Sequence, residues 1–277
     1  KTGGTVTLSG AINSSSGAGV VLTTNTGATI NLTGGVVVSS GTNSAFSATG
    51  GGIVNVTGAS NTLASTTGTA LNVTNTGIGA SGLTFRSISA NGAVNGIVLS
   101  NTGTTAGLTV TGTGNTAVGG DASGGTIQNT TGPGVLLTNT RQVSFTNLTI
   151  QNTADSGIDG TQVTNFTFDN GTINNSGTSQ GNFMSNIDFN DDTASGTVQL
   201  SGTVVITDST LTNAYYSGVD IQNYTGSIGD LTISNNSIVS STSTASSKAP
   251  GIRVIAFGGA DITRATINGN TVTNFPS

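Results

Sequence analysis

The sequence predicts an all-β fold in which short parallel strands coil around one axis for about nine to ten turns and form three short sheets. Three observations lead to this prediction. Glycine supplies 43 of the 277 residues and charged residues only 6%, while the strong helix formers are scarce. Two apolar patterns recur along almost the whole chain. Within each pattern apolar and polar residues alternate, which is typical of strands buried on one face.

The first pattern is a small residue followed by two apolar residues with one position between them. Clear copies are Gly96-Ile97-Val98-Leu99 and Gly218-Val219-Asp220-Ile221. The first apolar residues are 23 to 38 positions apart, and the longest interval contains an inserted loop at Thr113–Ser123. These anchors are Val20, Phe46, Leu71, Ile97, Val135, Ile158, Ile187, Val219 and Ile252.

The second pattern follows the first in each repeat and reads apolar-Thr-apolar-x-Asn-x-Thr-apolar-x-Asn. Phe166-Thr167-Phe168 with Asn170, Thr172, Ile173 and Asn175 is a clear copy. Asparagine tolerates the left-handed backbone of a tight corner, and stacked asparagine amides can bond to one another. We therefore expect a structural asparagine ladder formed by Asn152, Asn175, Asn213 and Asn274.

A coil with such short strands buries its apolar residues only by stacking on the next coil. The chain is therefore expected to form three parallel sheets along one axis. At residues 5–275 it resembles a right-handed parallel β-helix, the architecture of the pectate-lyase-like superfamily and of bacterial surface adhesin and autotransporter-type passenger repeats. The resemblance implies the right-handed coil. We predict a single β-helix domain over residues 1–277 that belongs to a longer or stacked solenoid, because neither end offers a capping helix.

Composition excludes several functions. The chain has no His and no Cys, so it lacks the residues of a His- or Cys-based catalytic triad, a zinc site of the usual kind and disulfides. Six scattered basic residues argue against a nucleic-acid partner, which needs clustered positive charge. No run of 18 apolar residues is present, so no membrane span is expected. The chain begins with Lys1, which suggests a processed or excised piece.

Three aspartates occupy the same position in successive copies of the first pattern. Asp159, Asp188 and Asp220 each follow the buried anchor by one residue, and Arg253 holds that position in the next copy. Adjacent coils lie about 4.8 Å apart, so the side chains should form a row on the outer face. Carboxylates are the ligands that Ca²⁺ prefers, and Asp191 and Asp192 follow the same strand. The row therefore predicts a calcium site, with no other cofactor required, or a solvated acidic patch.

Longer loops surround this row and carry aromatic residues. We expect Tyr215, Tyr216 and Tyr224 to wall a groove and to bind sugar rings. In the pectate-lyase-like enzymes the corresponding sheet carries the acids, often with Ca²⁺. The resemblance thus implies polysaccharide cleavage by Asp188, Asp220 and Arg253 as an alternative. The chain departs from those enzymes because it has no Gly-His-Gly motif and would have Arg253 as its only base.

The sequence favours a non-enzymatic function. We expect an extracellular structural or adhesive segment of a bacterial surface protein or fibre, with glycans, a host cell or a neighbouring cell surface as partner. End-to-end self-association is a further expectation. The alternative is a polysaccharide-binding or polysaccharide-cleaving β-helix that uses the aspartate row, with or without Ca²⁺.

Overall fold

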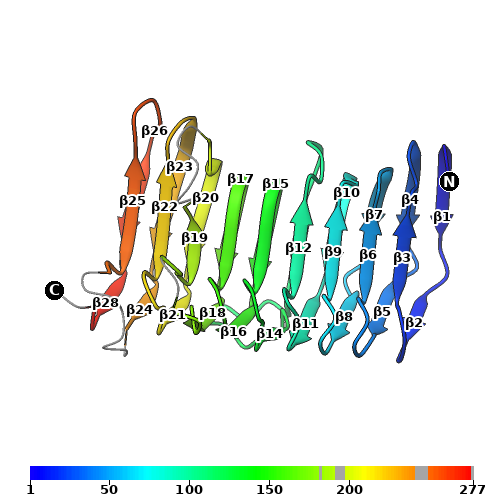
Figure 1. The fold of residues 1–277 in the computed structure, drawn as a ribbon, viewed down its shortest axis with the longest axis horizontal. Helices are drawn as coiled ribbons and strands as arrows, with labels where there is room; N and C mark the ends of the chain where they lie inside the picture. The colour runs from blue at the N-terminus through cyan, green and yellow to red at the C-terminus, as the bar shows by residue number, and fades with distance from the viewer. Residues whose placement is uncertain (181–182, 191–196, 241–248, 276–277) are drawn as a thin grey trace.

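A computed structural model shows a long rod in which the chain winds from one end to the other (Figure 1). It describes residues 1–180, 183–190, 197–240 and 249–275. Strands are the regular elements of these residues, and every strand pairing is parallel. The predicted all-β parallel β-helix is confirmed. No helix within the described residues is long and apolar enough to cross a bilayer.

The first pattern forms one stack of strands along the rod. Every predicted anchor is the first residue of a strand in this stack. The strands are β3 (Val20–Thr23), β6 (Phe46–Thr49), β9 (Leu71–Thr74), β12 (Ile97–Ser100), the first half of β15 (Val135–Thr146) and of β17 (Ile158–Asp169), β19 (Ile187–Phe189), β22 (Val219–Asn223) and β25 (Ile252–Ala256).

The second pattern supplies the other two stacks. The second stack contains β1 (Gly4–Leu8), β4 (Ala28–Leu32), β7 (Ile53–Val56), β10 (Gly77–Phe85), β13 (Leu108–Val110), the second halves of β15 and β17, β20 (Leu200–Thr207), β23 (Ser227–Ser234), β26 (Asp261–Ile262) and β27 (Ala265–Asn268). The third contains β2 (Ile12–Ser14), β5 (Val36–Ser39), β8 (Thr62–Ser65), β11 (Ser87–Asn91), β14 (Thr126–Gln128), β16 (Thr149–Thr153), β18 (Thr172–Ser176), β21 (Thr210–Thr212), β24 (Ser237–Val239) and β28 (Thr271–Thr273).

The three expected sheets are joined into two by hydrogen bonding. The first and second stacks form one 18-stranded sheet, and the third stack is a separate 10-stranded sheet. The reason lies in the corner between the first two stacks. In β15 the chain turns at Asn139 and Gln142, which adopt φ values of 48° and 51°, and the strand continues through the corner. Single left-handed residues therefore bend the chain without ending the strand.

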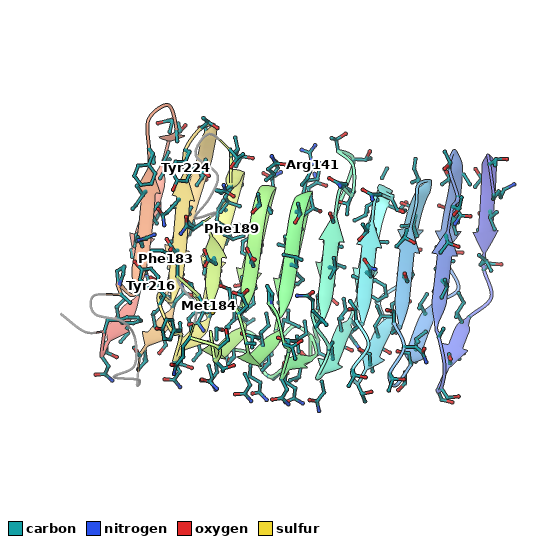
Figure 2. The ribbon with its side chains drawn as sticks, in the orientation of Figure 1. Arg141, Phe183, Met184, Phe189, Tyr216 and Tyr224 are labelled. Atoms are coloured by element: carbon teal, nitrogen blue, oxygen red, sulfur yellow. The ribbon has the colours of Figure 1, made fainter. Side chains whose placement is uncertain are left out.

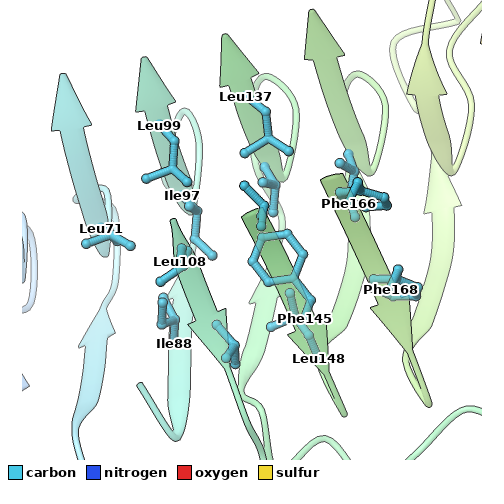
Figure 3. Packing of buried hydrophobic residues seen from close by; sticks show 14 of the residues in the cluster. Leu71, Ile88, Ile97, Leu99, Leu108, Leu137, Phe145, Leu148, Phe166 and Phe168 are labelled. Atoms are coloured by element: carbon cyan, nitrogen blue, oxygen red, sulfur yellow. The ribbon is translucent and has the colours of Figure 1, made fainter. Parts of the chain in front are cut away.

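The core consists of columns of identical or similar apolar side chains from successive coils (Figure 3). One column of the third stack pairs Ile127 with Ile150 and Ile150 with Ile173. Aromatic rings link neighbouring coils in the middle of the rod. The Phe166 ring lies 6.4 Å from the Phe145 ring and 4.9 Å from the Phe189 ring, both in edge-to-face contact. The side chains of all three are buried, so these coils share a continuous aromatic core.

A small residue precedes the first-stack strand because the third sheet approaches the chain closely at that corner. A Cβ atom on Gly96 would lie 2.5 Å from Cγ2 of Ile127, and one on Gly157 would lie 2.5 Å from Cγ2 of Ile173. Real Cβ atoms essentially never show such distances. The recurring glycine of the first pattern is therefore explained by the β-branched isoleucine packed against it.

Replacing Gly96 with alanine is expected to lower the free energy of unfolding by about 1 to 3 kcal/mol, because the added methyl group overpacks the core against Ile127. Urea denaturation measures the change. The double variant Gly96→Ala/Ile127→Ala should cost less than the two single variants together, since it removes the clash. Gly10→Ala is the control, because no described atom lies within 4 Å of its Cβ position. Equal effects of Gly96→Ala and Gly10→Ala would refute the close approach.

Amide ladders run along two corners of the rod. In one, Asn129 bonds to Asn91, Asn152 to Asn129 and Asn175 to Asn152, with N–O distances of 2.8, 3.3 and 2.8 Å. The expected ladder is thus present at Asn152 and Asn175, whereas Asn213 bonds to Asn174. Asn274 shares their left-handed backbone, with a φ of 63°. In a second ladder Asn139 bonds to Asn101, and Asn101 to Asn75, both at 2.9 Å.

The inserted loop of the longest repeat lies along the rod and not away from it. We call residues 112–125 the bracing loop. Its Gly124 amide donates to the Asn147 carbonyl of the next coil, its Gly119 carbonyl accepts from the Thr172 hydroxyl, and its Gly119 amide donates to the Asp208 carbonyl. The loop therefore contacts three coils that follow it in the sequence.

Core columns become exposed at the ends of the rod. Ile233 and Ile238 are fully buried, whereas their partners in the last coil, Ile267 and Val272, are 49% and 45% exposed. Leu8 in the first coil is also exposed. At the ends of the described rod, apolar side chains that continue the core columns are therefore exposed.

Candidate functional site

The aspartate row forms on the first stack as the spacing predicts. Asp159 of β17 pairs in register with Asp188 of β19, Asp188 with Asp220 of β22, and Asp220 with Arg253 of β25. The register follows from the anchors, since each of these residues comes directly after the anchor of its coil. Three acidic groups and one basic group therefore lie side by side along four successive coils.

The middle of the row is buried, whereas Asp159 at one end and Arg253 at the other are partly exposed. Asp188 is 6% exposed and Asp220 is fully buried, although both point away from the apolar core. All five residues of β22 are buried. Phe183 and Tyr216, from the connections before β19 and β22, lie near the start of β22 and β25 (Figure 2). The loops expected to wall a groove here include residues 181–182, 191–196 and 241–248, which lie outside the described residues, so the groove stays a prediction.

Arg253 contacts one residue of the row and two aromatic side chains. Its Nε atom lies 2.9 Å from Oδ1 of Asp220 and forms an ion pair, while its Nη1 donates to the Tyr216 hydroxyl at 2.8 Å. The guanidinium carbon lies 5.2 Å from the centre of the Tyr216 ring and 5.5 Å from that of Phe183. These two rings contact each other edge to face at 4.9 Å. The arginine is thus held by a carboxylate and two aromatic rings.

Asp188 has a different environment from its neighbour. Its Oδ2 accepts a hydrogen bond from the Ser156 hydroxyl at 3.2 Å, and its Oδ1 accepts one from the Asn190 amide at 3.0 Å. Burial raises the pKa of the Asp188 carboxyl well above its ordinary value of 3.8, and the charges of Asp220 and Asp159 raise it further. The hydrogen bonds from Ser156 and Asn190 act in the opposite direction. Folding therefore disfavours the charged form of Asp188, whereas Asp220 forms an ion pair with Arg253.

Asp188→Asn is expected to stabilise the protein at neutral pH. A carboxyl whose pKa is raised by folding favours the folded state below its unfolded pKa, and that contribution is lost as pH rises through the folded pKa. Asparagine keeps the shape without the buried charge. The stability difference between the variant and the wild type should therefore grow as pH rises above 3.8 and vanish at lower pH. Thermal unfolding across this range measures it.

Asp230→Asn is the matched control for this pH series. A hydrogen bond and the charge of Arg264 lower the pKa of Asp230, so its contribution to stability is present above the unfolded pKa and is lost as pH falls. The control should therefore shift the pH dependence in the opposite direction to Asp188→Asn. Identical pH profiles for the Asp188 variant and the wild type would show that no carboxyl with a raised pKa lies at this position.

The predicted calcium site combines the aspartate row with Asp191 and Asp192. Within the described residues, no three His, Cys, Asp or Glu side chains come together as a metal-binding group. The cation that contacts Asp220 is the guanidinium of Arg253. Asp191 and Asp192 lie outside the described residues. Calcium binding at the row therefore stays a prediction.

The three predicted sugar-binding tyrosines lie in three different places. Tyr216 packs on Arg253, as described above. Tyr215 lines a hollow of about 340 Å³ together with polar residues of the preceding coil. Tyr224 stacks on Phe257 at the other end of the first-stack strands, with ring centres 4.9 Å apart and planes at 12° (Figure 2). The tyrosines therefore do not form one aromatic wall.

A second hollow lies at the corner between the first and second stacks. It measures about 460 Å³ and is lined by Asn139, Gln162, Thr164, Thr197, Val198, Ser201 and Thr225. Sequence reasoning did not identify it, since its residues come from four coils and share no common motif. The one available signal was Gln162, a glutamine at the corner position that Asn139 holds in the coil before.

Comparisons with known proteins identify no relative of this chain, since no family model, no curated protein and no solved structure matches it.

Proposed function

We propose that the chain is a non-catalytic β-solenoid that acts as a structural and adhesive segment of an extracellular bacterial surface protein or fibre. The observation that carries the proposal is the burial of Asp188 and Asp220 in the middle of the aspartate row. Asp220 is fully buried and paired with Arg253, and Tyr216 and Phe183 pack over that pair. A carboxylate in this position stabilises the fold and has no access to a polysaccharide chain.

The rest of the surface supports an adhesive function. Only 6% of the residues are charged, and the corners present ladders of asparagine and glutamine amides with hydroxyl groups beside them. Such a surface offers many hydrogen-bond donors and acceptors at regular intervals and attracts no strongly charged partner. Glycans of a host or neighbouring cell are partners of the matching chemistry.

Polysaccharide cleavage is the second candidate, and one observation favours it. Asp188 and Asp220 are neighbours on adjacent strands, and the pKa of Asp188 is raised while Asp220 is ion-paired. A protonated acid beside a carboxylate is the arrangement that general acid–base chemistry requires. In this candidate Asp188 is the acid, Asp220 the base and Arg253 the group that orients the substrate. The burial of Asp188 and Asp220 argues against it.

Incubation with acidic and uncharged polysaccharides in the presence of Ca²⁺ distinguishes the two candidates. We expect no new reducing ends and no unsaturated products from the wild-type chain. Product formation that is lost in both Asp188→Asn and Asp220→Asn would refute the structural proposal and support the enzyme. Product formation that both variants retain would indicate a contaminating activity, and the proposal would then be tested again on protein freed of it.

The apolar side chains at both ends support end-to-end stacking on a second copy of the chain. Ile267 and Val272 at one end and Leu8 at the other continue the buried columns into solvent. Parallel strands at an open end can pair with another strand. Negative-stain microscopy at rising concentration tests self-association. Rods of several lengths are expected if copies stack, and rods of one length at all concentrations would refute stacking.

A further inference from the structure

The hollow between the first and second stacks has rigid walls. Asn223, which is 1% exposed, accepts hydrogen bonds from the backbone amides of Gln199 and Leu200 and donates to the Leu200 carbonyl at 2.6 Å. Next to this anchor, Gln199 donates to the Thr197 hydroxyl at 2.7 Å. One buried asparagine therefore fixes the segment that carries Thr197, Val198 and Ser201 into the lining.

An amide ladder stops at this hollow. Asn139 donates to Asn101, so the carbonyl oxygen of its own side chain is the next acceptor in the ladder. The residue at the next position, Gln162, has the same left-handed backbone, with a φ of 57°, but no hydrogen bond joins it to Asn139 in the described residues. Both side chains line the hollow. The hollow thus receives an amide acceptor and an exposed amide that neighbouring coils leave unused.

Hydroxyl groups complete the lining beside these amides. The Thr164 and Ser201 hydroxyls lie 3.0 Å apart on paired strands. Thr197 and Thr225 add two more from the following coils. No lining residue carries a charge, and the volume of about 460 Å³ lies in the range of small-molecule sites. Closely spaced neutral donors and acceptors suit a ligand with many hydroxyl groups.

An aromatic surface adjoins the hollow. Tyr224 directly precedes Thr225, and its ring stacks on that of Phe257 in the next coil, which is 39% exposed. The two rings therefore lie on the coil that carries Thr225 and on the coil after it. Aromatic faces bind the apolar faces of sugar rings, and hydroxyl and amide groups bind their edges.

We propose that this corner, from Asn139 to Thr225 with the Tyr224–Phe257 pair beside it, binds a short stretch of an uncharged polysaccharide. The inference rests on the proposed adhesive function and supplies its ligand class and its surface. The sugar hydroxyls bond to Asn139, Gln162, Thr164 and Ser201. The next sugar ring along the rod packs against Tyr224 and Phe257.

Calorimetric titration of the full chain with uncharged hexasaccharides of glucose, galactose and mannose tests the proposal, with hexagalacturonate as the charged comparison. At least one uncharged ligand should bind saturably. Gln162→Asn should weaken binding about tenfold and raise the melting temperature, because a shorter amide continues the asparagine ladder and withdraws both amides from the hollow. Thr164→Val should weaken binding while the melting temperature confirms folding. Val94→Ala, at an exposed position of an earlier coil, is the control and should leave binding unchanged, while Tyr215→Ala tests the other hollow.

Three results would overturn the inference. They are no binding of any uncharged hexasaccharide, equally tight binding of hexagalacturonate, and loss of binding in Tyr215→Ala with retention in Gln162→Asn and Thr164→Val. The last result would keep the adhesive function and move the site. Chromatography of the ligand after each titration distinguishes failure of this inference from failure of the proposed function. A shortened oligosaccharide would refute the non-catalytic function itself.

Discussion

Asp220→Ala is expected to lower the free energy of unfolding by about 3 kcal/mol, because it leaves Arg253 without its partner in a site largely closed to water. Arg253 is 21% exposed and Asp220 is fully buried, so solvent replaces little of the lost ion pair. The variant also removes the acceptor of the Gln222 amide. Chemical denaturation at neutral pH measures the loss.

Two variants show whether the ion pair causes this loss. Asp220→Ala/Arg253→Met removes both charges and should recover part of the stability, because no buried charge is left unpaired. Asp230→Ala breaks the exposed pair with Arg264 and should change stability little, since solvent screens that pair. A double variant as unstable as Asp220→Ala would show that packing, and not the charge of Arg253, accounts for the effect.

Phe166→Ala is expected to cost about 4 kcal/mol, because it opens a cavity between two other buried rings. Its ring contacts Phe145 of the coil before and Phe189 of the coil after, so the cavity would interrupt the stacking of three coils. The exposed Phe257 is the control, and its replacement by alanine should have a much smaller effect. Comparable losses in the two variants would contradict a continuous aromatic core.

The periodicity of the sequence predicted the fold well because every coil buries the apolar face of the same short strands. The anchors are the first strand residues of the first stack, from Val20 to Ile252, since only an alternating pattern can bury one face of so short a strand. The same argument placed Asp159, Asp188, Asp220 and Arg253 in register. A feature that each coil specifies with one residue can therefore be predicted from the repeat.

The burial of the row could not be predicted in this way. The Arg253 side chain that pairs with Asp220 is held by Phe183 and Tyr216, which lie in connections of unequal length and belong to no repeat. The union of the first and second stacks into one sheet depends on the left-handed backbone at residues such as Gln142. Glutamine rarely adopts this backbone, so its presence in the sequence does not predict the bend. The polar hollow depends on Asn223, whose side chain bonds to a coil that precedes it by 23 residues. Contacts of this kind do not recur from coil to coil, so the repeat cannot predict them.

The bracing loop docks on coils that are synthesised after it. Gly119 leaves the ribosome well before Asp208, whose carbonyl it binds. Domains form from the N-terminus as the chain emerges, so the early coils can stack while this loop still has no docking surface. Its attachment waits for the coils of Thr172 and Asp208. A nascent or truncated chain that stops before Thr172 lacks both partners of Gly119, so its residues 112–125 should be cut by proteases more readily than those of a chain that extends past Asp208.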